Sequence, residues 1–134
     1  MVTAEQRAFL EKNRLVVIGF NRKKGPPHMT PVYYALDGDD IIMSTTRTRF
    51  KTKAIRRNPD VSLCVLGEQP PFPYLLVYGK GVIEDEGAVD VMMRVGERMT
   101  GQPIGEAARL ALEERATKEG RVVLRFTPES FHPR

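Results

Sequence analysis

The chain has 134 residues, of which 41% are hydrophobic and 28% charged, and its formal net charge at pH 7 is +4. This length and composition predict one globular domain over residues 1–134 and exclude a disordered chain. The single cysteine, Cys64, excludes an intramolecular disulfide, and no segment approaches the roughly 20 apolar residues that span a bilayer. Because the charged start of the sequence lacks a signal-peptide core, we expect a cytoplasmic protein with no membrane partner.

The first part of the chain predicts a helix followed by strands. Thr3 and Gln6 have the spacing of a capping box, which indicates an amphipathic helix over residues 3–13. Three apolar runs then predict strands over residues 14–21, 29–36 and 41–46. Residues 37–40 form a hairpin turn between the last two. Pro31 has no N–H to donate, so its strand is expected at a sheet edge or a bulge.

The rest of the chain predicts three further strands and three helices. In chain order these are a helix, two strands, two helices and a strand, over residues 49–58, 61–66, 74–84, 88–99, 105–118 and 121–128. Short connections between strands imply antiparallel pairing. Six strands that must hide their edges tend to close into a barrel. The expected fold is therefore mainly β, of the α+β type, with a six-stranded antiparallel β-barrel and flanking helices.

A basic segment follows the third predicted strand. Six positive charges and no acid lie between Arg47 and Arg57. The segment runs from the hydroxyl residues Ser44, Thr45 and Thr46 into the first turn of a helix. A helix N-terminus attracts anions, and hydroxyls and cations beside it would complete a phosphate site.

The helical phase of this segment singles out Lys51. At about 100° per residue, the inward arc of the helix is defined by Phe50, Ala54 and Ile55. Lys51 falls within that arc, whereas three other cations lie opposite: Arg49, Lys53 and Arg56. A lysine on an apolar arc either extends past the edge of the core to water or meets an anion, and the phase alone leaves both readings open.

Two stretches resemble the flavin split-barrel superfamily of pyridoxamine-phosphate-oxidase-like proteins. They are STTRTRFKTKAIRRNP at residues 44–59 and PHMTPVYY at residues 27–34. The first is most similar to the small actinobacterial-type branch that uses the deazaflavin coenzyme F-420, whose pattern R-x-K-T-[RK]-x-[LI]-R-R-[DN]-P begins here at Arg49. The resemblance implies a split β-barrel that works as a homodimer, with the cofactor pocket at the interface between the subunits.

The resemblance also implies an activity and a set of site residues. The activity is hydride transfer from reduced coenzyme F-420 to an unsaturated small molecule. The implied cofactor-binding residues are Met29, Thr30, Pro31 and Val32 along the ring; Ser44, Thr45, Thr46, Arg49, Lys51 and Thr52 around the phosphate; and Tyr74, with Tyr78, from the other subunit. No catalytic side chain and no metal ligand is implied.

Three alternatives stand beside this interpretation. FMN also ends in a phosphate, so an FMN-dependent oxidoreductase would use the same site, and a non-enzymatic carrier would bind the cofactor without turnover. A nucleic-acid binder would interleave aromatic and basic residues, but only Phe50 is available and it is expected to face inward, so no nucleic-acid partner is expected. His28 is expected in a solvated loop, and Cys64 in the core.

Overall fold

The structure is a computed structural model that describes residues 2–133. Its helices are α1 (Ala4–Lys12), α2 (Phe50–Arg57), α3 (Ala88–Thr100) and α4 (Glu106–Glu119). Its strands are β1 (Leu15–Phe20), β2 (His28–Tyr33), β3 (Ala35–Asp37), β4 (Asp40–Thr46), β5 (Asp60–Leu66), β6 (Tyr74–Glu84) and β7 (Arg121–Pro133). No helix of the described chain combines the length and the apolar character needed to cross a membrane.

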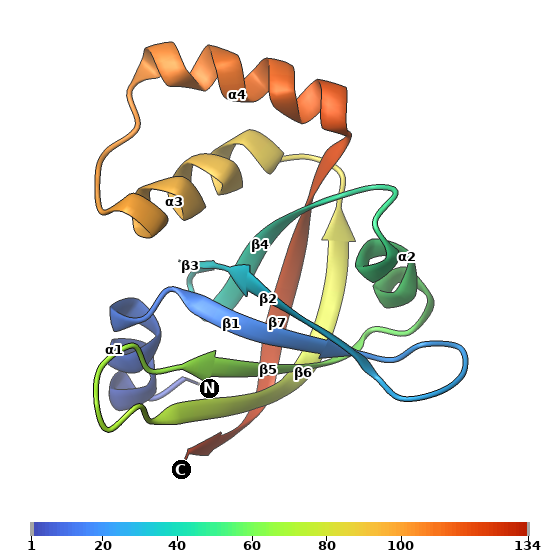
Figure 1. The fold of residues 1–134 in the computed structure, drawn as a ribbon, viewed down its shortest axis with the longest axis vertical. Coiled ribbons are helices and arrows are strands. Elements are labelled where there is room, and N and C mark those ends of the chain that lie inside the picture. The colour runs from blue at the N-terminus through green and yellow to red at the C-terminus, as the bar shows by residue number, and fades with distance from the viewer. Residues whose placement is uncertain (1, 134) are drawn as a thin grey trace.

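The strands form one antiparallel sheet in the order β2-β1-β5-β6-β7-β4-β3. Its two edge strands, β2 and β3, are successive parts of one segment and are separated only by Tyr34. The sheet therefore curls until its edges meet at this bend, with the helices outside it (Figure 1). The expected antiparallel barrel with flanking helices is confirmed, and Pro31 lies in an edge strand as predicted.

The sheet has seven strands instead of six, because the strand predicted over residues 29–36 is bent into β2 and β3. The bend is fixed at Tyr34, whose side chain is fully buried. Its backbone N–H donates to the Arg14 carbonyl oxygen (3.2 Å), and its hydroxyl donates to the Leu10 carbonyl oxygen (2.8 Å). An apolar run gives no sign of such long-range partners, so the sequence predicted one continuous strand.

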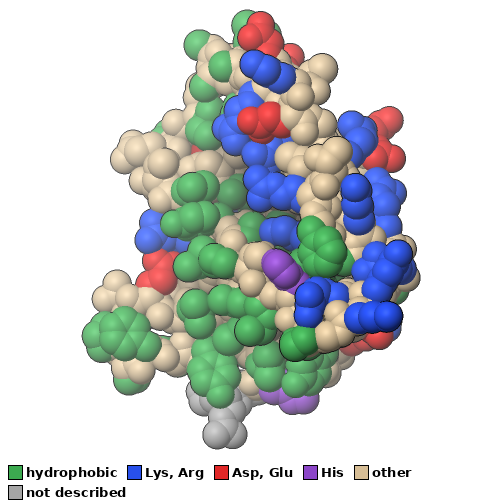
Figure 2. Space-filling model, turned by 45° about the vertical axis from the view of Figure 1, so that its right-hand side comes forward, with side chains coloured by type: hydrophobic (Ala, Val, Ile, Leu, Met, Phe, Trp, Pro, Cys, Tyr) green, Lys and Arg blue, Asp and Glu red, His purple; other side chains and the backbone are tan. Residues whose placement is uncertain are grey.

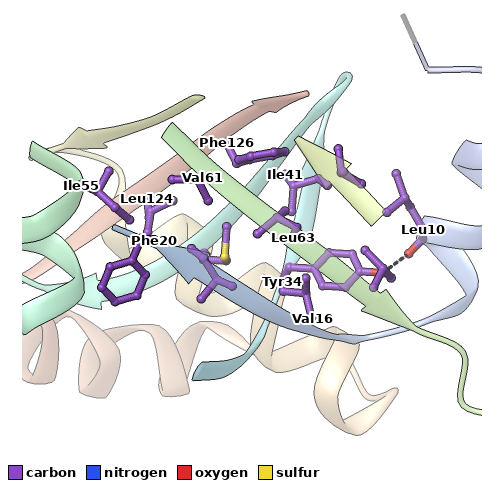
Figure 3. Packing of buried hydrophobic residues seen from close by; sticks show 14 of the residues in the cluster. Leu10, Val16, Phe20, Tyr34, Ile41, Ile55, Val61, Leu63, Leu124 and Phe126 are labelled. Atoms are coloured by element: carbon purple, nitrogen blue, oxygen red, sulfur yellow. Dashed lines mark hydrogen bonds between the residues drawn. The ribbon is translucent and has the colours of Figure 1, made fainter. Parts of the chain in front are cut away.

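The concave face of the sheet encloses the main hydrophobic core. Ile41, Leu63 and Phe126 lie in its centre, and each is at most 2% exposed. Leu10 of α1 lies at one end of this row of side chains and Ile55 of α2 at the other (Figure 3). Burial of each such side chain stabilises the fold by about 1.5–3 kcal/mol. The barrel is thus closed at one end by the helix that carries the basic segment.

The inward arc of α2 differs from the prediction at one position. Ala54, Ile55 and Lys51 are buried as expected, but Phe50 is 48% exposed and Thr52 is fully buried. The Thr52 hydroxyl donates to the Thr46 carbonyl oxygen (2.6 Å) and lies 3.2 Å from the Thr45 hydroxyl. The inward prediction for Phe50 is therefore wrong, because this polar contact turns Thr52 towards β4 and moves Phe50 to the rim.

Helices α3 and α4 form a second layer outside the barrel (Figure 1). Val91 and Val95 of α3 pack with Ile42 and Val123 on the convex face of the sheet. Arg98, near the end of α3, donates to the carbonyl oxygens of three residues: Leu10, Asn13 and Tyr34. This arginine ties α3 to the end of α1 and to the bend between β2 and β3.

Candidate functional site

Two strand edges lie open beside the bend at Tyr34, and together we call them the split. β3 pairs with β4 only as far as Ile42, so residues 43–46 of β4 have no strand on that side within residues 2–133. β2 pairs only with β1 among the same residues. Val32 of β2 and Ser44 of β4 line one cavity, which shows that the two edges approach each other. The split offers unpaired backbone N–H and C=O groups to a ligand.

The three hydroxyl residues that end β4 point in two directions. Successive side chains of a strand alternate between its faces, so Ser44 and Thr46 share one face and Thr45 lies on the other. Thr45 and Thr52 contact each other inside the barrel, where they join α2 to β4. Ser44 is half-buried, and its hydroxyl accepts a long hydrogen bond from Arg121 Nη1 (3.4 Å). Ser44 thus lines the cavity at the split, Thr46 is buried on the same face of β4, and Thr45 and Thr52 support the split from within.

Lys51 is a buried cation with no anionic partner among residues 2–133. Lys51 is only 9% exposed. No carboxylate of the described residues lies within 4.0 Å of its ammonium nitrogen. Burial, and secondarily the nearby charge of Arg49, lowers the pKa of Lys51. A buried ammonium is costly unless an anion accompanies it, so this position favours an anionic ligand. Arg49 is exposed at the N-cap of α2, and its side chain makes no capping hydrogen bond.

The four residues predicted along the cofactor ring divide between the two faces of β2. Thr30 and Val32 pair with the buried Ile18 and Val16 and face inward, whereas Met29 and Pro31 are exposed on the convex face. What the four share is the open backbone edge of the strand. The Thr30 hydroxyl is buried and has no hydrogen-bond partner among the described residues. It therefore keeps its capacity to donate and accept at the split.

The sequence missed an aromatic group at the rim of the split. His28 begins β2 instead of lying in a loop, and its ring centroid lies 5.2 Å from Phe20 and 5.4 Å from Phe50. His28 and Phe50 are both exposed and flank the start of α2. Figure 2 shows a histidine where a field of hydrophobic side chains meets a field of Lys and Arg. No signal in the sequence reveals this group, because it depends on the phase of α2.

Tyr74 does not join these residues within one chain. It starts β6, seven residues before Gly81, the point where β6 packs against Ile55 of α2. At about 3.3 Å per residue, Tyr74 lies some 23 Å along the strand from that contact. Tyr74 and Tyr78 are exposed on the convex face of the sheet. Tyr74 is thus far along β6 from α2, and its contribution to a cofactor site from a second chain stays a prediction.

Several solved structures share this fold. A conserved hypothetical protein from Mycobacterium tuberculosis is 25% identical, with a TM-score of 0.85 over 99% of this chain and 84% of the other. An F420 reductase is 24% identical, with a TM-score of 0.76 over 94% of each chain. An FAD-binding protein from Mesorhizobium loti is 18% identical, with a TM-score of 0.66 over 98% of this chain and 92% of the other.

The comparison of sequences leads to a family. No curated protein matches this sequence. The family model described as pyridoxamine 5'-phosphate oxidase matches residues 2–133, which include every strand and helix of the fold and the whole of the split. The chain belongs to the pyridoxamine 5'-phosphate oxidase family.

Proposed function

We propose that the protein binds coenzyme F-420 and transfers hydride from the reduced cofactor to an unsaturated small molecule. Membership of the pyridoxamine 5'-phosphate oxidase family supports a flavin-type cofactor, and one structure of the same fold is an F420 reductase. The observation that carries the proposal is the buried ammonium of Lys51, which lacks a described counter-ion. A cofactor phosphate would supply that charge.

The residues at the split fit the phosphate end of such a cofactor. Lys51 would hold the phosphate from within, and Arg49 would approach it from the exposed side with its forked guanidinium. The hydroxyls of Ser44 and Thr46 would donate from β4. Because the contact between Thr45 and Thr52 joins α2 to β4, these groups keep fixed relative positions before the ligand arrives, which reduces the entropy lost on binding.

The exposed face of α2 supports F-420 over FMN. The deazaflavin carries a glutamate tail that FMN lacks, and three cations on this face could bind its carboxylates: Lys53, Arg56 and Arg57. Arg56 has a single described ion pair, with the exposed Asp85 at 3.3 Å. An exposed pair of this kind contributes little and exchanges readily for another carboxylate.

In the proposed reaction the chain binds and orients its ligands. A bound deazaflavin supplies the hydride, which is chemistry that no side chain provides. The open edge of β2 and the Thr30 hydroxyl would hydrogen-bond the polar edge of the ring. His28 and Phe50 would cover one side of it and exclude water. We assign no general acid.

The proposal includes a homodimer that buries the convex face of the sheet around one row of residues. Strand register aligns Met29, Gly19, Ser62 and Tyr78 in one row across β2, β1, β5 and β6. At the two ends of the row, Met29 is 69% and Tyr78 44% exposed. An uncovered apolar sheet face of this kind is typical of an interface. The interface would bring Tyr74 of a second chain towards the split.

The oligomeric state is testable by sedimentation. At micromolar concentration the protein should sediment at about twice its mass of 15.1 kDa. Tyr78→Glu should give monomers and weaken cofactor binding, because it places a charge in the row. Val82→Glu, on the same strand beyond the row, is the matched control. A wild-type monomer with undiminished cofactor affinity would exclude the shared pocket.

The cofactor is tested by titrating the purified protein with F-420 and with FMN. We expect F-420 to bind more tightly, and its advantage to shrink as salt screens the cations that hold its tail. Tighter binding of FMN would contradict the choice of cofactor while leaving the phosphate site intact. Binding of neither would overturn the proposal. Binding of F-420 without oxidation of its reduced form by any of a panel of enones and quinones would identify a carrier.

A further inference from the structure

The cavity that Val32 and Ser44 line at the split extends between β4 and the helical layer. It has a volume of about 500 Å³ and opens between α3, α4 and the convex side of the split, within the size range of small-molecule sites. Its walls are mostly apolar and come from both helices and the loop between them: Met92, Met99, Pro103, Ile104 and Leu112. We call it the α3–α4 cavity. Lys51 and Thr30 do not line it.

Hydrogen bonds fix the loop between α3 and α4 beside the cavity. The Ile104 N–H donates to Glu97 Oε2 (3.0 Å), and the Gln102 N–H donates to the Thr100 hydroxyl (3.1 Å). Gly96 allows Ile104 to lie close against α3, because a Cβ at that position would come within 2.7 Å of Ile104 Cδ1. The loop therefore covers one side of the cavity without filling it. A pocket that is already formed loses less conformational entropy when it binds a ligand.

Two arginines give the cavity one positively charged end. Arg115 and Arg121 both line it, and both direct Nε to the same oxygen of Glu119, at 3.3 and 2.8 Å. One carboxylate therefore serves two guanidinium groups. Among the described residues, the Nη atoms of the two arginines make a single hydrogen bond, from Arg121 Nη1 to the Ser44 hydroxyl (3.4 Å). The Arg121 side chain is 15% exposed, so an unused donor there favours a further anion.

From this geometry we infer that the α3–α4 cavity binds a small apolar molecule that carries one carboxylate. The apolar body lies among the methionines and Leu112, and the carboxylate lies between Arg115 and Arg121. Methionine side chains adapt to irregular apolar ligands, so we expect the cavity to accept apolar carboxylates of various shapes and not one particular molecule. The cavity borders the proposed cofactor site and shares Val32 and Ser44 with it, but Arg115, Arg121 and the methionines are not among the residues proposed to bind the cofactor.

The test uses decanoate and decanol, which have the same chain length and differ in charge. Calorimetry on the full chain without cofactor should show one decanoate per chain, bound about tenfold more tightly than decanol. Arg115→Ala and Arg121→Met should each reduce that preference, whereas Lys118→Ala, on the exposed side of α4, should not. Equal binding of the two probes, or an unchanged preference in both arginine variants, would overturn the inference.

A second pair of variants tests whether decanoate binds in the α3–α4 cavity. Met99 is 42% exposed and lines the cavity, so Met99→Trp should fill it without disturbing the core and weaken both probes about tenfold or more. Leu110→Trp is the control, since Leu110 is 67% exposed on α4 outside the cavity. If Met99→Trp binds decanoate as tightly as Leu110→Trp does, the ligand lies elsewhere and the inference fails. Thermal unfolding of each variant verifies that it is folded.

Discussion

Two cations of this protein, Arg125 and Lys51, are both withdrawn from solvent but have opposite surroundings. Arg125 of β7 contacts three carboxylates, with Nη1 2.9 Å from Asp37 and 3.1 Å from Asp40, and Nε 3.1 Å from Glu84. Burial acts to lower the pKa of Arg125, but these carboxylates outweigh it and the pKa is raised. No carboxylate of the described residues pairs with Lys51, and the pKa of Lys51 is lowered.

The difference separates a structural cation from one that, under the proposed function, binds an anionic ligand. The carboxylates around Arg125 come from β3, β4 and β6, so that residue joins the strands on the convex face within the chain itself. Lys51 gives the fold no such link and bears the cost of burial alone. Under the proposed function, a bound cofactor phosphate offsets that cost. Three predictions test this division.

The largest expected effect concerns Lys51 and the cofactor phosphate. A charge-assisted hydrogen bond is worth about 1.5–3 kcal/mol, so Lys51→Ala should weaken F-420 binding roughly ten- to a hundredfold. Lys53→Ala, on the exposed side of α2, should cost under about 1 kcal/mol with a tail-less cofactor such as FMN. Fluorescence titration measures both. Equal losses in the two variants would reduce the segment to a diffuse basic patch.

The next effect concerns stability and Arg125. Arg125→Met leaves three carboxylates facing one another, and we expect it to lower the free energy of unfolding by about 1–2 kcal/mol, since the group is partly solvated. Cofactor affinity should not change. Arg7→Met is the control, because Arg7 pairs with a single exposed carboxylate, Asp39, and should cost under about 0.5 kcal/mol. Urea unfolding measures both variants, and a stable Arg125→Met would contradict the structural role.

The smallest effect is a pH dependence of the cofactor-free protein. Because the pKa of Lys51 is lowered from 10.5, the unfolded chain binds more protons than the folded chain between the lowered pKa and 10.5. The free energy of unfolding therefore rises with pH through that window. Lys51→Met should lack this rise, so its stability advantage over wild type should be greatest at neutral pH. A constant difference between the two proteins would show that Lys51 titrates normally.

The sequence predicted those features of the fold that local patterns determine. The capping box of Thr3 and Gln6 is present, β6 spans Tyr74–Glu84 as expected, and the inward position of Lys51 follows from its phase on α2. Features that depend on distant partners were missed. The bend at Tyr34 requires the Leu10 carbonyl, and the exposure of Phe50 requires Thr52 to contact Thr45. Neither contact can be read from hydrophobic periodicity.

The candidate site was only partly readable for the same reason. The motif from Arg49 to Pro59 indicated a phosphate site, but it did not show that Thr45 and Thr52 are engaged inside the barrel. It also could not place His28, which lies against Phe50 only because β2 reaches the start of α2. The cavity between α3 and α4 has no local signature, since its walls come from both helices, the loop between them and three strands.

The position of β7 has a consequence for how the chain folds as it is made. β7 is the last strand in sequence, yet it lies in the middle of the sheet, between β4 and β6. Until residues 121–133 have left the ribosome, both of those strands present an open edge to their surroundings. Open edges invite pairing with other chains, and long-range strand pairing is slow. During synthesis both edges therefore stay open until β7 pairs with them, and the same strand brings Arg125 to its carboxylates.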